Sequence, residues 1–363
     1  MSFNLIIGLG NAGTQIVKLA AESEKLSDTK FYAIDSVTAN ADVETVHAVT
    51  MIPIITDDKA GSGRLRERGA AMFEYHDQNH AFDALYQDAI EAKAPIIIVT
   101  SSAGGTGSGI ASVLCTKLYA LSDDINIVPL IICPSLNDPD MFHMNTNDLM
   151  IELENAGVET YSIFRNEYGT ANYNQINKDV VTTIELILGK LYDATNNQSI
   201  DESDLDMMMR VPGRFVAAYA ESADPKKLKR LITEKALHSY QPGWTNDDTK
   251  TPTIYTAFGL TSPFARDDFA DVFEDVRARI SHFVDEYRNI CEKDGISSAS
   301  IIIAGLPRAE LRNIDCEYEE TKSIADGVTK SNRPSFMRNK KAIRTSHVKE
   351  VKDLTNIKKY DWK

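Results

Sequence analysis

Short apolar runs alternate with longer segments of helical periodicity through the first half of the chain. The apolar runs have the length of buried strands and fall at residues 4–7, 31–35, 95–100, 126–133 and 160–164. Between them, apolar residues recur at helical spacing at residues 13–24, within 63–92, at 107–121 and at 141–156. This alternation is typical of a parallel sheet that helices cover on both faces. The pattern therefore predicts an α/β fold with a doubly wound parallel sheet.

A second, smaller α/β region is predicted in the other half of the 363-residue chain. A long amphipathic segment from Gln175 to about Asn196 leads into it. Beyond that segment the pattern predicts strands at 215–221, 253–260 and 299–306 and helices at 225–238 and 265–291. We therefore divide the chain into a first domain at 1–174, a central connecting helix at 175–200, a second domain at 201–329 and a tail at 330–363.

Charge separates the tail from the rest of the chain. The whole chain carries a formal charge of −14, yet residues 330–363 hold 11 Lys and Arg against 3 Asp and Glu, a balance of +8. The remaining residues are strongly acidic, which argues against broad nucleic-acid binding by the folded part, because phosphate backbones are held by clustered Lys and Arg. The basic tail could bind nucleic acid or an acidic partner, or it could be a solvated extension.

Cysteine usage and hydropathy bear on the cellular setting. Cys115, Cys133, Cys291 and Cys316 show no paired spacing, which predicts free thiols in a reducing compartment. The amino terminus has no basic region before an apolar stretch, and no apolar run is long enough to cross a bilayer. We expect a cytoplasmic protein without membrane insertion.

Two glycine-rich turns follow strands and precede helices. The first is Gly8-Leu9-Gly10-Asn11-Ala12-Gly13, and the second runs from Ser101 to Gly109. Such turns let backbone N–H groups converge on an anion at the positive end of a helix, and two of them in one domain indicate a ligand with several phosphates. The candidate phosphate-binding residues are Gly8, Gly10, Asn11, Ala12, Ala103, Gly104, Gly105, Thr106, Gly107 and Ser108.

These turns have two other possible functions. With Asp35 at the end of the next strand, the first turn matches a dinucleotide fingerprint, so an NAD(P)-dependent oxidoreductase is one alternative. Glycines that serve only a tight turn and helix packing are another. A dehydrogenase needs only one such turn, however, and this chain has a second glycine-rich turn after a later strand. Neither turn contains the Gly-Lys-Ser/Thr triplet of Walker-type loops, so helix ends, backbone N–H groups and Mg²⁺ must balance the phosphate charge.

The second turn carries a family resemblance. Gly104-Gly105-Thr106-Gly107-Ser108-Gly109 resembles the signature loop of the tubulin and FtsZ superfamily, whose motif has Gly, Ala or Ser where Ala103 stands. The resemblance covers roughly residues 3–310 and is strongest in the first 180. By the same resemblance, the ribose or metal side involves Asp35 and Ser36, the loop that senses the terminal phosphate includes Gly63 and Arg64, and the ribose-contacting loop includes Asn137.

The base-binding side can be argued from spacing and from the resemblance. Tyr173 and Asn177 are four residues apart at the start of the long helix, so they share one face, where a ring can stack on a purine and an amide can bond its edge. The family places an aromatic residue and an asparagine at this spacing. Asn166 resembles its second base-reading asparagine, although an ordinary loop or capping role is equally open for each residue alone.

The resemblance also implies catalysis shared between subunits. In the family, acidic residues of a loop after the central helix enter the site of the next subunit and position the attacking water. The corresponding segment here is Asp201-Glu202-Ser203-Asp204-Leu205-Asp206, which departs from the FtsZ pattern Asn-x-Asp-x-x-Asp at its first two positions. We rank Asp206 first, Asp204 second and Asp201 third as the catalytic acid; a solvated acidic loop is the alternative.

The resemblance implies a GTPase that binds GTP or GDP with Mg²⁺ and polymerises head to tail. Within the superfamily the chain is most similar to the TubZ branch, which segregates plasmid or phage DNA and binds a DNA-binding adaptor through a basic tail. Pro334-Ser335-Phe336-Met337-Arg338 instead resembles the partner-binding tail peptide of FtsZ, so a cell-division GTPase is the alternative within the family. A non-catalytic nucleotide-binding scaffold is a further alternative. His76 and His80 share a helix face but lack a third ligand, so we assign no metal-ligating side chains.

Overall fold

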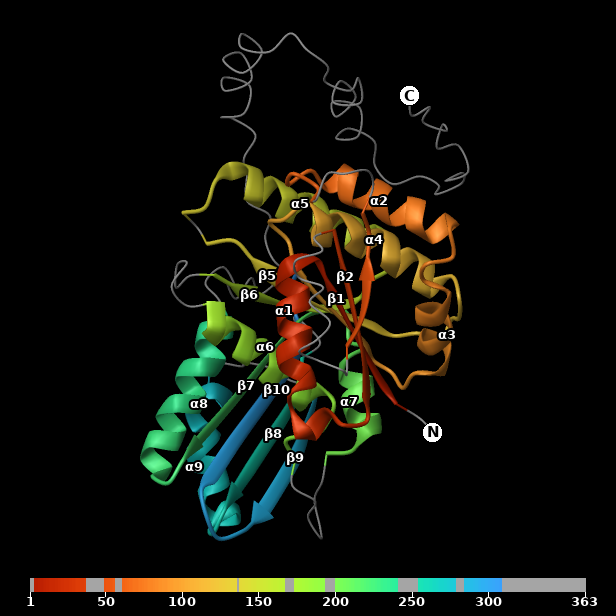
Figure 1. The fold of residues 1–363 in the computed structure, drawn as a ribbon. Coiled ribbons are helices and arrows are strands. Elements are labelled where there is room, and N and C mark those ends of the chain that lie inside the picture. Colours follow the sequence, from red (N-terminus) through yellow and green to blue (C-terminus); the bar gives the residue numbers. More distant parts are fainter. Residues whose placement is uncertain are drawn as a thin grey trace, which may run out of the picture. The chain divides into compact units, whose positions relative to one another are not determined.

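The computed structural model describes residues 3–36, 49–55, 61–135, 137–166, 173–192, 200–240, 254–278 and 284–308. The chain divides into compact units at residues 1–313 and 314–363, and all described residues lie in the first. The basic tail predicted at 330–363 lies outside the described residues. Within the first unit, one ten-stranded sheet has the strand order β3-β2-β1-β4-β5-β6-β7-β10-β8-β9 (Figure 1).

The first six strands form the predicted doubly wound parallel sheet. Its strands are β1 (Asn4–Leu9), β2 (Thr29–Asp35), β3 (Val49–Pro53), β4 (Ile96–Ser101), β5 (Ile127–Cys133) and β6 (Thr160–Arg165). Its helices are α1 (Gly10–Ala21), the short 3₁₀ helix η1 (Glu24–Leu26), α2 (Arg66–Gln78), α3 (Asp83–Glu91), α4 (Thr106–Tyr119) and α5 (Asp140–Asn155). The sequence prediction of an α/β fold with this sheet is confirmed.

Two hydrophobic cores lie on the two faces of this sheet. Successive side chains of a strand point to opposite faces, so Ile6 enters one core while Leu5 and Ile7 enter the other. The first core is closed by α1 and by α6 (Tyr173–Ile187), and the second by α2, α3, α4 and α5. Burial on both faces explains why these strands read as continuous apolar runs.

The second half of the sheet is mixed. It contains β7 (Gly213–Ser222), β8 (Tyr255–Ser262), β9 (Asp285–Glu292) and β10 (Ser297–Leu306), with helices α7 (Glu202–Met208), α8 (Pro225–Tyr240) and α9 (Ala265–Arg277). Strand β10 is antiparallel to β7 and β8, and β8 is parallel to β9. The two halves join through a short parallel pairing of β6 with β7. A third core under α8 and α9 is centred on Phe258, Phe269 and Phe273.

The structure corrects the predicted helix at 265–291. Helix α9 ends at Arg277, and Asp285–Glu292 is the edge strand β9. Charged residues such as Asp285, Glu286 and Arg288 weaken the strand signal of this segment, and pairing with β8 overrides it. The central helix is also shorter than predicted: α6 ends at Ile187, and Gly189 at φ +72° follows in a turn.

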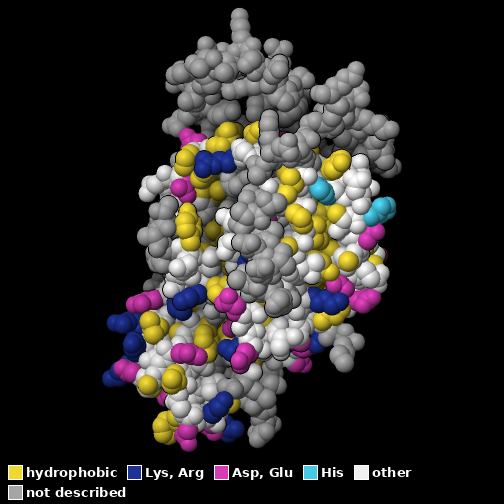
Figure 2. Space-filling model, in the orientation of Figure 1, with side chains coloured by type: hydrophobic (Ala, Val, Ile, Leu, Met, Phe, Trp, Pro, Cys, Tyr) yellow, Lys and Arg dark blue, Asp and Glu magenta, His cyan; other side chains and the backbone are white. Residues whose placement is uncertain are grey.

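Figure 2 shows acidic and basic side chains interspersed over the lower part of the face in view. There, Lys229 of α8 is 3.1 Å from carboxylate oxygens of both Asp271 and Glu274 of α9. Among the described residues, no helix has the length and apolar character needed to cross a membrane.

Candidate functional site

The two glycine-rich turns meet where the strand order of the parallel sheet reverses. Strands β1 and β4 are parallel neighbours, and α1 and α4 leave their carboxyl ends to cover opposite faces. In open α/β sheets, this geometry opens a crevice outside the carboxyl ends of the strands, where ligands bind. The amino termini of α1 and α4 therefore border one crevice.

The turns touch through bare backbone. Gly10 has φ +66°, a conformation that L side chains rarely adopt, and a Cβ placed on it would lie 2.9 Å from the Gly107 nitrogen. A Cβ on Gly107 would lie 2.5 Å from the Leu9 oxygen and 2.6 Å from Thr100 Oγ1. No side chain fits between the two turns, and this is why glycine stands on both sides of the contact.

The amino termini of α1 and α4 lack a side-chain cap. The residues that precede α1 and α4, Leu9 and Gly105, make no capping hydrogen bond through a side chain, and neither helix has an acidic residue in its first turn. The amino-terminal N–H groups of a helix have no partner within the helix, and they favour negative charge. Two such termini side by side fit a ligand that carries more than one anionic group.

Hydroxyl groups from three segments gather beside the second turn. Thr106 Oγ1 lies 2.7 Å from Ser36 Oγ, which follows β2, and it donates to Ser62 Oγ at 3.1 Å. The Ser36 N–H donates to Asp35 Oδ1 at 2.7 Å. Asp35, Ser36 and Thr106, predicted from separate stretches of sequence, thus lie together, and Ser62 lies beside them.

The segment from Gly61 to Leu65 is also held against the second turn. Asn145 of α5 donates through Nδ2 to the backbone oxygens of Arg64 at 3.3 Å and Ala103 at 3.0 Å. Arg64, at φ +65°, is exposed, with its guanidinium 4.8 Å from the centre of the Phe142 ring. Arg64 is the only cationic side chain in the stretches 8–13, 61–65 and 101–109. Backbone and hydroxyl donors therefore outnumber cationic side chains in these three stretches.

The predicted base-binding residues lie at the next strands of the same edge. The Asn166 N–H donates to the Cys133 oxygen at 3.0 Å, while its side-chain Oδ1 is buried without a hydrogen-bond partner among the described residues. Asn137 is exposed after β5. Tyr173, 49% exposed, and the partly buried Asn177 occupy the first turns of α6.

The acidic segment predicted as a loop is helix α7 and its cap. Asp201 Oδ1 accepts from the Asp204 N–H at 2.9 Å, and Asp204 Oδ2 accepts from the Asp201 N–H at 3.1 Å, which is a capping box. Asp206 accepts from Asn126 Nδ2 at 3.2 Å and from Arg210 Nε at 2.9 Å. The loop prediction is wrong because these carboxylates satisfy the amino terminus of a helix.

Helix α7 lies at the opposite end of the parallel strands from the glycine turns. Asn126 precedes β5, and Lys93, which pairs with Glu202 at 3.0 Å, precedes β4. Both contacts are therefore at the amino ends of strands whose carboxyl ends reach the glycine turns. A strand of six or seven residues spans about 20 Å at about 3.3 Å per residue. The acidic side chains cannot reach the glycine turns of their own chain.

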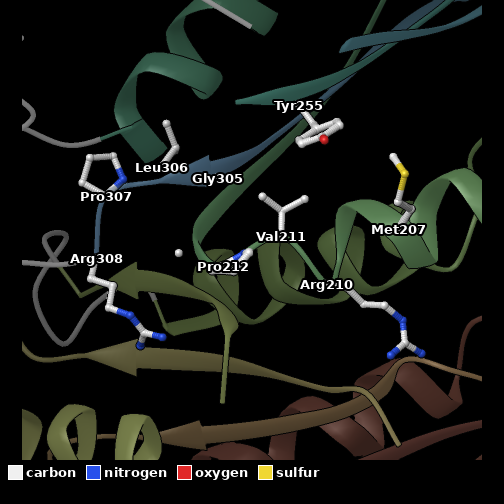
Figure 3. A pocket seen from close by; sticks show the side chains of 10 residues that line it. Met207, Arg210, Val211, Pro212, Tyr255, Gly305, Leu306, Pro307 and Arg308 are labelled. Carbon is white, nitrogen blue, oxygen red and sulfur yellow. The ribbon is translucent and has the colours of Figure 1, made fainter. Parts of the chain in front are cut away.

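A hollow of about 900 Å³ opens between α7 and the second half of the sheet (Figure 3). Met207, Val211, Tyr255 and Leu306 supply apolar lining. Arg210 and Arg308 also line it, and both bond within the chain, to Asp206 and to the Val158 oxygen at 3.0 Å respectively. The hollow is separate from the glycine turns and adjoins the acidic helix.

The described cysteines, Cys115, Cys133 and Cys291, are buried, and none of them forms a disulfide bond with another described residue. Burial raises the pKa of the Cys115 thiol to about 12 and that of Cys133 to about 11, so both stay protonated near neutral pH.

Comparisons with known proteins agree with this geometry. Residues 4–173 match the family model described as the Tubulin/FtsZ family, GTPase domain. CetZ2 of Haloferax volcanii, a tubulin-like protein, is 24% identical to this chain over 233 residues. The aligned region covers 60% of this chain and 63% of that protein, so it spans less than two thirds of the relative.

Solved structures from two other branches share the fold. TubZ of Bacillus thuringiensis serovar israelensis, in a GTPγS-form protofilament, matches with TM-score 0.65 and 18% identity over 90% of this chain and 93% of that one. An FtsZ dimer from M. jannaschii matches with TM-score 0.62 and 15% identity over 87% and 94%. Residues 4–173 are thus similar to the GTPase domain of the Tubulin/FtsZ family, and the described residues share the fold of the solved TubZ and FtsZ structures.

Proposed function

We propose that this protein is a GTPase that assembles head to tail and hydrolyses GTP when the acidic helix of one subunit reaches the nucleotide site of the next. The proposal rests on one observation: the glycine turns and helix α7 lie at opposite ends of the parallel strands of one sheet. The glycine turns stand at the carboxyl ends of β1 and β4, and α7 stands beside the amino ends of β4 and β5. A head-to-tail stack brings these two edges together, subunit after subunit.

The phosphate edge suits a guanine nucleotide with Mg²⁺. Two uncapped helix termini offer N–H donors to the phosphates. No cluster of three or more His, Cys, Asp or Glu side chains occurs among the described residues. Mg²⁺ commonly takes one or two carboxylates, phosphate oxygens and water. Asp35 beside Ser36 and Thr106 fits such a role, in which the ion would offset charge on the phosphates.

The base side supports guanine. The buried, unpartnered Oδ1 of Asn166 is an acceptor, and guanine presents N–H donors on its Watson–Crick edge. A donor that bonded this oxygen would remove the penalty of leaving it unsatisfied. Tyr173, exposed on the first turn of α6, is available to stack on the ring, and Asn177 one turn on is available to bond its edge.

The acidic helix would act in trans. A carboxylate beside the terminal phosphate would orient and polarise the attacking water, while N–H groups and Mg²⁺ of the other subunit stabilise the developing charge. The TubZ relative is described as a GTPγS-form protofilament and the FtsZ relative as a dimer, which supports self-association of this chain. We keep Asp206 first, Asp204 second and Asp201 third as the acid.

For the cellular role, we propose segregation of plasmid or phage DNA in the cytoplasm, with a DNA-binding adaptor held by the basic tail. The +8 balance of residues 330–363 supports a tail that binds an acidic surface. An FtsZ-like role in division is the second candidate, favoured by the segment from Pro334 to Arg338. CetZ, TubZ and FtsZ proteins all share similarity with this chain, so the tail supplies the argument for the branch.

Assembly and turnover test the proposal directly. Light scattering of the purified protein with Mg²⁺ should rise on adding GTP and not on adding NAD⁺. Phosphate release should begin only above a threshold protein concentration, because hydrolysis needs a neighbour. Binding of NAD(P) in place of GTP would identify an oxidoreductase, and GTP binding with no phosphate release at any concentration would identify a scaffold.

Two glycine substitutions separate packing from ligand binding. A Cβ on Gly104 meets nothing within 4 Å, whereas a Cβ on Gly107 meets Leu9 and Thr100. We expect Gly104→Ala to leave the free energy of unfolding within about 0.5 kcal/mol of the parent. It should still weaken GTP binding about tenfold, because in the proposed site the added methyl group would lie beside the phosphates. Gly107→Ala should lower the free energy of unfolding by about 1–3 kcal/mol as well. Parent-like GTP affinity of Gly104→Ala in calorimetric titration would remove the cradle from the proposal.

Substitutions at Asp206 and at its ion-pair partner Arg210 test the catalytic role of the acidic helix. Asp206→Asn should bind GTP and assemble but lose at least about a hundredfold in phosphate release, and its filaments should outlive those of the parent. Arg210→Ala removes the ion-pair partner of Asp206 and keeps the carboxylate and its bond from Asn126, so it should retain hydrolysis. Equal losses in the two variants would indicate a structural role for Asp206, and Asp204→Asn would then be the next variant.

The tail can be removed separately. A chain that ends before Lys330 should sediment with GTP as the full chain does, since the sheet and both proposed half-sites lie within residues 3–308. It should lose binding to the DNA-bound adaptor in a co-sedimentation assay. Adaptor affinity equal to that of the full chain would contradict the role of the tail.

A further inference from the structure

Arg66 is a buried cation at the start of α2 that the phosphate-site argument leaves unused. It directly follows the segment Gly61–Leu65, and its side chain is 6% exposed. A guanidinium this deeply buried requires partners for its charge and its N–H groups. Its partners show which segments it holds together.

The guanidinium joins two helices. Arg66 Nε donates to Ser108 Oγ at 3.2 Å, and Nη2 donates to the Ser108 backbone oxygen at 3.0 Å. On the other side, Nη1 and Nη2 donate to the two carboxylate oxygens of Glu152 on α5, at 3.0 and 2.6 Å. This is a bidentate pair, which fixes orientation as well as distance.

Ser108 extends the connection into the glycine turn. Its hydroxyl accepts from Arg66 and donates to the Gly104 backbone oxygen. The main chains are also in direct contact, since a Cβ on Gly109 would clash with the Arg66 oxygen and one on Gly69 would lie 2.5 Å from the Gly105 oxygen. The first turns of α2 and α4 therefore pack as one unit.

The charge of Arg66 is taken up within the chain. Glu152 neutralises it, and Ser112 Oγ donates to Glu152 Oε2 at 2.8 Å. Arg64, two residues earlier, is exposed and points its guanidinium to the Phe142 ring instead. The two arginines have different environments: Arg64 is accessible to a ligand, and Arg66 is committed to its neighbours.

We propose that Arg66 is a positioning residue that holds the segment Gly61–Leu65 in register with the turn Ala103–Gly109, so that both close on the terminal phosphate of a bound nucleoside triphosphate. The inference rests on the proposed function. It assigns the preference for a triphosphate over a diphosphate to the Arg66–Glu152 pair, although neither side chain touches the nucleotide.

Lysine cannot replace arginine in this arrangement. A guanidinium offers five donors in a planar fork, which here bind Ser108 and both oxygens of Glu152 at once. An ammonium keeps the charge as a single compact donor group. Arg66→Lys therefore preserves electrostatics while loosening the register between the two segments.

The test compares GTPγS with GDP on the full-length protein with Mg²⁺. Calorimetric titration of Arg66→Lys should show about a tenfold loss of GTPγS affinity and less than about a threefold loss for GDP, because only the terminal phosphate needs both segments. Ser112→Ala, which removes one bond to Glu152 and leaves Arg66 unchanged, should shift the ratio in the same direction by about twofold to threefold. Arg68→Lys, on the same helix, is the matched control and should keep the parent ratio.

Three outcomes would contradict the positioning role of Arg66. Equal losses for GTPγS and GDP, accompanied by a lower melting temperature, would make the pair a merely structural contact and overturn it. A parent-like ratio in both Arg66→Lys and Ser112→Ala would do so as well. Should Arg66→Lys not fold, the ratio in Ser112→Ala decides alone. A parent chain that binds neither nucleotide would instead refute the proposed function, and this inference with it.

Discussion

The contact between Gly10 and Gly107 sets the geometry on which the rest of the site depends. It joins two helix amino termini at the point where the strand order reverses, with main chain against main chain. Any side chain there would separate α1 from α4, and the N–H groups of the two termini would no longer face one ligand. The hydroxyls of Ser36, Ser62 and Thr106 gather around this contact, so the site needs few charged groups to bind an anion.

The division of the proposed active site between two edges of the sheet has a kinetic consequence. On the proposed mechanism, a single subunit would hold the phosphates at one end of the strands and the carboxylates at the other, so a triphosphate bound to the monomer would lack its acid. On the proposed mechanism, contact between subunits supplies that acid, and hydrolysis therefore follows assembly. No conformational change within a subunit is required for this order, because the sheet itself keeps the two parts separated.

The sequence reveals features that have a local signal. Both glycine turns follow continuous apolar strands, so their place at the carboxyl edge could be predicted, and the cap of α7 has a local signal in Asp201 and Asp204, three residues apart. Strand β9 could not be predicted, because its charged residues lie on an edge strand whose stability comes from pairing with β8. The partnership of Arg66 with Glu152 spans 86 residues and has no local signal at all.

The Arg66–Glu152 and Asp206–Arg210 ion pairs differ in burial and therefore in how easily their partners can be replaced. Arg66 is 6% exposed, so losing Glu152 would leave its buried charge without a counter-ion, which is strongly destabilising. Asp206 and Arg210 are 31% and 43% exposed, and an ion pair at that exposure contributes about 0–1 kcal/mol. Water or a neighbouring subunit can therefore replace Arg210 at little cost. The Asp206 carboxylate, which on the proposed mechanism meets the next subunit, is thus oriented by its partners and can exchange them more readily than buried Arg66 can exchange Glu152.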